Sequence, residues 1–230
     1  MRASVIVFPG SNCDRDVKVA LERITDGHVN MVWHADSEVP ESDLIVLPGG
    51  FAYGDYLRTG AMAAHSRIMR DVVAKAKAGT PLIGICNGFQ VLCEAGLLPG
   101  VLLRNASLKF VCKDVWLRVE ETATPFTSHY ALGEVIRLPV AHGEGNYFAD
   151  PDTLNALENE GRVVFRYVDE TGNRTPAANP NGSQHNIAGI CDSTRRVLGL
   201  MPHPERLIEP LLGGADGCRM FESVLAATLH

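Results

Sequence analysis

The sequence predicts an α/β protein whose sheet is mostly parallel in the first half of the chain and gains a mixed or antiparallel extension in the second half. In residues 1–100, short apolar runs alternate with segments of helical periodicity. These runs are apolar throughout, as in parallel strands that helices cover on both faces. From residue 113 onward, apolar and polar residues alternate within a run, which is typical of antiparallel strands with one solvated face.

The first half contains three expected strands and two expected helices. The strands are predicted at 4–8, 44–47 and 82–85, and the helices at 14–24 and 61–78. In the second helix, Ile68, Val72 and Ala76 recur every four residues and so share one face, and Gly79 is a suitable stop.

The second half contains shorter strands separated by loops rich in turn residues. The strands are predicted at 113–120, 136–140, 163–168, 187–190 and 197–200, with an exposed loop at 171–183. Asp216 is expected to cap a C-terminal helix whose apolar side chains include Met220 and Phe221.

The composition excludes several classes of protein. The chain has 230 residues and a net charge of −6, which argues against binding to nucleic acids or to anionic membranes. No apolar run approaches the roughly 20 residues that span a bilayer, and no export signal is visible at the N-terminus. The six cysteines form no CxxC pair. We therefore expect a single domain over residues 1–230, with free thiols and a cytoplasmic location.

The segment 84–88, Gly-Ile-Cys-Asn-Gly, is the strongest functional signal. It follows a predicted strand and leads into a helical pattern at 89–94, which is the layout of a nucleophile elbow. The two glycines relieve the crowding of a tight, strained turn, and the helix N-terminus favours a thiolate at Cys86. The alternative is a buried structural cysteine in an α/β turn.

His203 and Glu205 are the expected partners of this nucleophile. They follow the predicted strand 197–200, and prolines at 202 and 204 bias the segment toward an extended backbone. Residues two apart then point to the same side, so the carboxylate can orient the imidazole as in a catalytic triad. The alternative is a solvated loop with a chance His-x-Glu. The order Cys–His–Glu differs from that of α/β-hydrolases, in which the acid precedes the histidine.

Acyl chemistry also needs donors for an oxyanion. The backbone N–H of Asn87 follows the nucleophile, and Gly50 in the turn after strand 44–47 is the expected second donor. His142 and Gly143 belong to a glycine-rich segment that could hold a metal but offers too few ligands, so we expect it to contact a small polar ligand. No phosphate-binding glycine motif occurs, so no cofactor is expected in this chain.

These residues resemble the class I, triad-type glutamine amidotransferases, and more closely the glutaminase subunits of phosphoribosylformylglycinamidine synthase. The resemblance covers the chain from residue 3 to its end. The motifs that carry it are Gly84-x-Cys86-x-Gly88-x-Gln90, His203-Pro204-Glu205, and the segments 8–14, 48–58 and 178–183.

The resemblance implies a flavodoxin-like three-layer fold and a glutaminase mechanism. Cys86 would attack the side-chain amide of glutamine, and His203, held by Glu205, would protonate the departing ammonia. Gly50 and Asn87 would hold the oxyanion. Gln90 would bind the amino-acid end of glutamine, with help from His142 and Gly143.

The resemblance also implies partners. The ammonia would pass to a large synthetase subunit that uses ATP and Mg²⁺ and makes formylglycinamidine ribonucleotide in purine biosynthesis, often with a small bridging subunit. Glutaminase activity of the isolated chain would then be low and would rise on docking. Two alternatives remain: a Cys-elbow peptidase, deglycase or redox sensor, and a scaffold or regulatory subunit without turnover.

Overall fold

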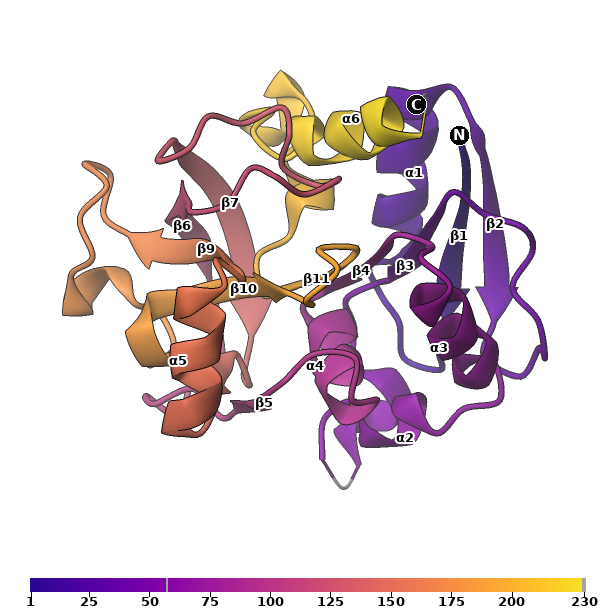
Figure 1. The fold of residues 1–230 in the computed structure, drawn as a ribbon, viewed down its shortest axis with the longest axis horizontal. Helices are drawn as coiled ribbons and strands as arrows, with labels where there is room; N and C mark the ends of the chain where they lie inside the picture. Colours follow the sequence, from indigo (N-terminus) through magenta and orange to yellow (C-terminus); the bar gives the residue numbers. More distant parts are fainter. Residues whose placement is uncertain (57, 229–230) are drawn as a thin grey trace.

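A computed structural model describes residues 1–56 and 58–228 and arranges them in three layers (Figure 1). A nine-stranded sheet, in the order β2-β1-β3-β4-β11-β10-β9-β6-β7, forms the middle layer. Helices α1 (Asp14–Thr25) and α6 (Cys218–Ala227) lie together on one side of it, and α3 (Met69–Lys77) and α4 (Asn87–Glu94) lie on the other. The predicted α/β class is thus confirmed. Within the motif 48–58, Leu57 lies outside the described residues.

Five neighbouring strands form the parallel part of the sheet. They are β2 (His28–Trp33), β1 (Arg2–Val7), β3 (Leu44–Leu47), β4 (Leu82–Ile85) and β11 (Val197–Leu200). Every residue of β3, β4 and β11 is buried, which explains why these runs are apolar throughout. The predicted bounds of these three strands match the structure.

The predicted extension of the sheet is antiparallel. It consists of β10 (Ile187–Cys191), β9 (Val163–Val168), β6 (Val111–Val119) and β7 (Val135–His142). In β6, Val115, Leu117 and Val119 are buried while the residues between them are partly or fully exposed, as the alternation predicted. A separate small sheet pairs β5 (Val101–Leu103) with β8 (Asn146–Phe148).

The predicted helix at 61–78 is wrong in one respect, because the structure divides it into α2 (Ala61–Ala64) and α3. At the break, the backbone N–H of Ile68 donates to the carbonyl of His34, 3.3 Å away in the loop after β2. A contact 34 residues distant along the chain therefore interrupts a segment whose local periodicity favours one helix.

Three further elements differ from the prediction or are missing from it. Asp216 does not cap α6, because its Oδ2 accepts a hydrogen bond from the backbone N–H of Arg137 at 2.8 Å, and Gly217 occupies the N-cap position. The edge strand β2 was not predicted. Nor was α5 (Pro151–Asn159), which begins with an Asp150 cap that accepts from the N–H of Thr153.

The carboxyl ends of β3, β4 and β11 meet at one edge of the sheet, since Ile85 pairs with Leu200 and Leu47 with Gly84. In α/β sheets, ligands bind at this edge. None of the helices in residues 1–56 and 58–228 is long and apolar enough to cross a membrane.

Candidate active site

Cys86 occupies a strained turn between β4 and α4. Its backbone has φ 52° and ψ −105°, in a region that costs a non-glycine residue roughly 1–3 kcal/mol. Two backbone hydrogen bonds hold Cys86 in this conformation. Its N–H donates to the carbonyl of Leu200 on β11 at 2.8 Å, and its carbonyl accepts from the N–H of Phe89 at 3.0 Å. The side chain remains 6% exposed. This is the geometry of a nucleophile elbow.

The two glycines of the elbow are required by close approach of the backbone. A Cβ on Gly84 would lie 2.6 Å from the carbonyl oxygen of Gly88, and a Cβ on Gly88 would lie 2.0 Å from the carbonyl oxygen of Leu47. Gly88, the second residue of α4, thus lies directly against β3. The spacing Gly-x-Cys-x-Gly therefore reflects packing of the helix start onto the sheet.

His203 and Glu205 lie just beyond β11, the strand next to β4. Their side chains are almost fully buried, and His203 Nδ1 lies 2.7 Å from Glu205 Oε1. Because an ionised carboxylate can only accept, Nδ1 carries the proton and donates it to this bond. Among the described residues, His203 Nε2 has no hydrogen-bond partner. Glu205 thus orients the imidazole with Nε2 free for proton transfer.

The charge state of His203 follows from its neighbours. Burial alone would lower the pKa of His203, but the Glu205 carboxylate, then Cys86 and Cys13, raise that pKa well above its ordinary value. The Glu205 carboxylate thus favours the imidazolium form of His203, which lies near Cys86. Such a cation can protonate a leaving group.

Gly50 and Asn87, the two residues that the sequence predicts as oxyanion donors, both lie near Cys86. Asn87 is the first residue of α4, where backbone N–H groups have no partner within the helix. Its side-chain oxygen accepts from the N–H of Ala52 at 3.1 Å, which ties the elbow to the turn that contains Gly50. Gly50 and Cys86 line the same cavity.

This cavity has a volume of about 150 Å³ and is lined in part by Cys86. It brings together five of the residues that the sequence singled out, namely Gly50, Cys86, Gln90, His142 and Gly143. The other lining residues are Phe51, Asp55, Thr59, Phe110, Ala141 and Glu144. The predicted residues thus meet at one edge of the sheet, although they come from widely separated segments.

The amide of Gln90 is already engaged by the protein. Its Oε1 accepts from Asn87 Nδ2 at 2.8 Å, and its Nε2 donates to the carbonyl of Glu144 at 2.6 Å. In this structure Gln90 therefore connects α4 to the glycine-rich segment and shapes the cavity wall.

Both ring nitrogens of His142 are engaged as well. Asn105 directs its Nδ2 to two backbone carbonyls, so its Oδ1 is the acceptor that faces His142 Nδ1 at 3.1 Å. His142 Nε2 then accepts from Asn181 Nδ2 at 3.4 Å. Burial, followed by the nearby His203, lowers the pKa of His142 to about 4, so this ring is neutral. His142 and the backbone of Gly143 form a fixed wall of the cavity.

Sequence reasoning assigned no role to Asp55, Thr59 or Glu144, although Glu144 stands in the glycine-rich segment with His142 and Gly143. Thr59 donates a hydrogen bond to Glu144, and Asp55 Oδ1 is buried without a partner among the described residues. Burial, and then the charge of Glu144, raise the pKa of Asp55 to about 6. The available signal was the polar residues Asp55 and Thr59 within the glycine-rich stretch after β3.

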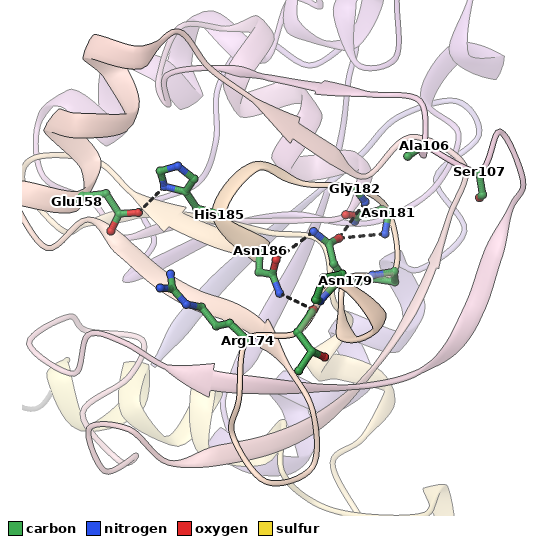
Figure 2. A pocket seen from close by; sticks show the side chains of 12 residues that line it. Ala106, Ser107, Glu158, Arg174, Asn179, Asn181, Gly182, His185 and Asn186 are labelled. Atoms are coloured by element: carbon green, nitrogen blue, oxygen red, sulfur yellow. Dashed lines mark hydrogen bonds and ion pairs between the residues drawn. The ribbon is translucent and has the colours of Figure 1, made fainter.

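A second hollow has a volume of about 970 Å³ and is lined in part by Asn181 (Figure 2). Asn179, Asn181 and Asn186 line it. The first two belong to the loop 171–183 that the sequence predicts to be exposed, but Asn181 is buried. Asn181 contacts His142 and thus stands between this hollow and the cavity beside Cys86. Cys86 does not line this hollow but does line the smaller cavity, which makes the smaller cavity the candidate active site.

Comparisons with known proteins agree with this geometry. The CobB/CobQ-like glutamine amidotransferase domain matches residues 1–214. The phosphoribosylformylglycinamidine synthase subunit PurQ of Novosphingobium aromaticivorans is 56% identical over 224 residues, which are 97% of this chain and 96% of the relative. The subunit of the same name from Thermomicrobium roseum is 54% identical over 231 residues and covers 100% of this chain and 98% of the relative.

Solved structures show the same fold. The structure of PurLQS from Thermotoga maritima matches with a TM-score of 0.87 and 47% identity, over 99% of this chain and 98% of the other. A glutamine amidotransferase from Thermotoga maritima matches with a TM-score of 0.62 over 100% of this chain and 97% of its own, and its 16% identity supports the fold alone. The chain therefore belongs to the glutamine amidotransferase family, among the PurQ subunits of phosphoribosylformylglycinamidine synthase.

Proposed function

We propose that this chain, a glutamine amidotransferase subunit, hydrolyses glutamine with Cys86, His203 and Glu205 and delivers the ammonia to a synthetase subunit. One observation carries the assignment of residues: a buried His203–Glu205 pair with a free Nε2 lies at the same sheet edge as the strained Cys86. The family match supplies the substrate class.

The first half-reaction forms a thioester. The Cys86 thiolate attacks the carbon of the glutamine side-chain amide, and the carbonyl electron pair moves onto oxygen. The N–H groups of Gly50 and Asn87 stabilise this oxyanion. The C–N bond then breaks while His203 gives its Nε2 proton to the leaving nitrogen, which departs as NH3.

The second half-reaction releases glutamate. Neutral His203 takes a proton from water, and the resulting hydroxide attacks the thioester carbon. The C–S bond breaks, and Cys86 leaves as a thiolate beside the restored imidazolium. Glu205 stays ionised throughout and stabilises the charge on His203 in both steps.

We assign recognition of the α-ammonium group of glutamine to Asp55 and Glu144. Both carboxylates line the cavity that Cys86 also lines, and the buried Oδ1 of Asp55 has no partner in the described part of the chain. Arg104 lies 3.6 Å from Glu144 and partly offsets its charge, whereas no ion pair within that part involves Asp55. A ligand ammonium would satisfy the Asp55 carboxylate.

Asp55→Asn should therefore raise KM for glutamine about tenfold, because the variant loses a charge-assisted contact to the substrate. The kinetics should be measured with glutamine and with 4-carbamoylbutanoate, which lacks the α-amino group. We expect the preference for glutamine to shrink in the variant, and KM of the unmodified enzyme to rise as the pH falls through about 6, where Asp55 becomes protonated. An equal loss with both substrates would refute the assignment.

Assembly with a synthetase is the remaining part of the proposal. The name of the Thermotoga structure joins PurQ to PurL and PurS, and we extend this association to a large synthetase subunit, which would use ATP and Mg²⁺ in the cytoplasm, and to a small bridging subunit. The exposed rings of Phe51 and Phe110, 6.5 Å apart at the cavity, support a protein partner at its mouth, because exposed apolar surface favours docking.

Glutamine hydrolysis should be measured for the chain alone and after addition of the synthetase and bridging subunits. We expect low turnover alone and at least a tenfold rise in the complex, because docking at the mouth of the cavity would fix its walls around the bound glutamine. Ammonia that reaches the acceptor without exchanging with added ¹⁵N-ammonium would support direct transfer. Equal turnover in both samples would contradict the dependence on docking.

A further inference from the structure

Cys13 is a buried thiol that the reaction above does not use. It directly precedes α1 and is 1% exposed. Its sulfur, a ring nitrogen of His203 and a carboxylate oxygen of Glu205 all lie within 4.8 Å of one another. A Cβ on Gly49 would lie 3.0 Å from this sulfur and 2.8 Å from His203 Cε1, so the glycine permits the close approach.

The thiol of Cys13 also contacts Arg206. Arg206 Nη2 donates to the sulfur at 2.7 Å, and the S–H of Cys13 donates to Asn12 Oδ1 at 3.0 Å. The thiol is therefore satisfied both as an acceptor and as a donor. A guanidinium this close to the sulfur places positive charge where a metal ion would have to bind, so the cluster is not suited to a cation.

Without Cys13, Arg206 would have a stronger hydrogen-bond acceptor nearby, the carboxylate of Glu205. The Nε of Arg206 lies 4.0 Å from Glu205 Oε1 and 3.9 Å from Asp16 Oδ2, at the outer limit of an ion pair and beyond hydrogen-bond distance. Glu205 Oε2 is buried and has no hydrogen-bond partner among the described residues. A guanidinium that was released from Cys13 could turn toward this oxygen, since carboxylates bind guanidinium groups more strongly than thiols do.

We propose that Cys13 is a positioning residue that keeps the Arg206 guanidinium from hydrogen bonding to Glu205 and thereby leaves His203 as the hydrogen-bond partner of the Glu205 carboxylate. A second cation on Glu205 would weaken the attraction between the carboxylate and the imidazolium. This proposal rests on the proposed function, because the imidazolium is the group that protonates the leaving ammonia.

The sign of the effect follows from all charged or titratable groups around His203. Glu205 and Arg206 lie beside it on the turn Pro204–Arg206, Cys86 lies at the elbow, and His142 lies on β7. Cys13 directly precedes α1, and Asp16 lies in its first turn. Arg206 is the permanent cation of this set. Its movement onto Glu205 would therefore lower the pKa of His203.

The test compares Cys13→Ala, Cys13→Ser and the double variant Cys13→Ala/Arg206→Met in the assembled complex. For Cys13→Ala we expect the alkaline limb of kcat/KM for glutamine to move about one pH unit lower, a roughly tenfold loss on that limb. Cys13→Ser should shift less, because the hydroxyl still accepts from Arg206. Removal of Arg206 in the double variant should return the limb toward the unmodified profile.

A second readout does not depend on glutamine turnover. The pH dependence of Cys86 alkylation by iodoacetamide, followed by peptide mass, reports the thiolate–imidazolium pair directly. We expect its acid limb to move upward in Cys13→Ala and to return in the double variant. An unchanged profile, or a shift that the double variant retains, would overturn the proposal. If the alkylation profiles shift as expected but the unmodified complex has no glutaminase activity, the result would instead count against the proposed function.

Discussion

Replacing Cys86 with alanine is expected to abolish glutamine hydrolysis, with a loss in kcat of more than about 10³-fold, because no other group can form the thioester. Alanine keeps the Cβ of cysteine and meets the same strain at φ 52°, so the elbow should fold as before. Glutamate release by the assembled complex is the measurement.

The control for this variant is synthesis from added ammonia. If Cys86 acts only in glutamine hydrolysis, the complex that carries Cys86→Ala should still make its amidine product from ammonium salts at a rate close to that of the unmodified complex. A parallel loss of ammonia-dependent synthesis would indicate that the substitution disrupts assembly. Substantial hydrolysis of glutamine by the variant would exclude Cys86 as the nucleophile.

Replacing Gly88 with alanine is expected to cause the largest loss of stability. The new methyl group would lie 2.0 Å from the carbonyl oxygen of Leu47, and β3 cannot retreat because it pairs with both β1 and β4. Overpacking of a rigid core typically costs about 1–3 kcal/mol, and a clash with backbone costs more. We expect the free energy of unfolding to fall by at least about 3 kcal/mol, measured by urea denaturation.

Gly143→Ala is the matched control for Gly88→Ala. Gly143 has no left-handed φ, and the nearest atom to a Cβ there is Phe110 Cδ2 at 3.8 Å, which is ordinary contact. The free energy of unfolding of this variant should lie within about 1 kcal/mol of that of the unmodified chain. Equal stability of the two variants would mean that α4 can shift away from β3, and the packing account of the elbow would then fail.

The sequence predicted the central strands well because burial on both faces leaves a clear local signal. The runs 44–47, 82–85 and 197–200 are apolar throughout and end at proline or glycine or at the elbow. The edge strand β2 lacks that signal, since His28, Met31 and Trp33 are exposed and polar residues interrupt the run. The break between α2 and α3 depends on His34, a contact that no local pattern contains.

The residues of the candidate site also differ in how far the sequence predicts them. Cys86, His203 and Glu205 could be found because each stands in a short motif at the end of a buried strand. Asp55 stands in the motif 48–58, but its place in the cavity could not be predicted. That place depends on three consecutive left-handed residues, Tyr53, Gly54 and Asp55, and brings Asp55 near the charge of Glu144. The contact of Arg206 with Cys13 joins residues 193 positions apart and has no trace in local sequence.

Labelling of the assembled complex with a glutamine-shaped diazoketone tests the central claim most directly. The reagent should form one adduct, and peptide mapping should locate it on Cys86, because Cys86 is the nucleophile within the cavity. Excess glutamine should prevent the adduct, and the Cys86→Ala variant should not react. Labelling spread over several cysteines, or labelling of Cys86 that glutamine does not prevent, would contradict the assignment of this cavity as the glutamine site.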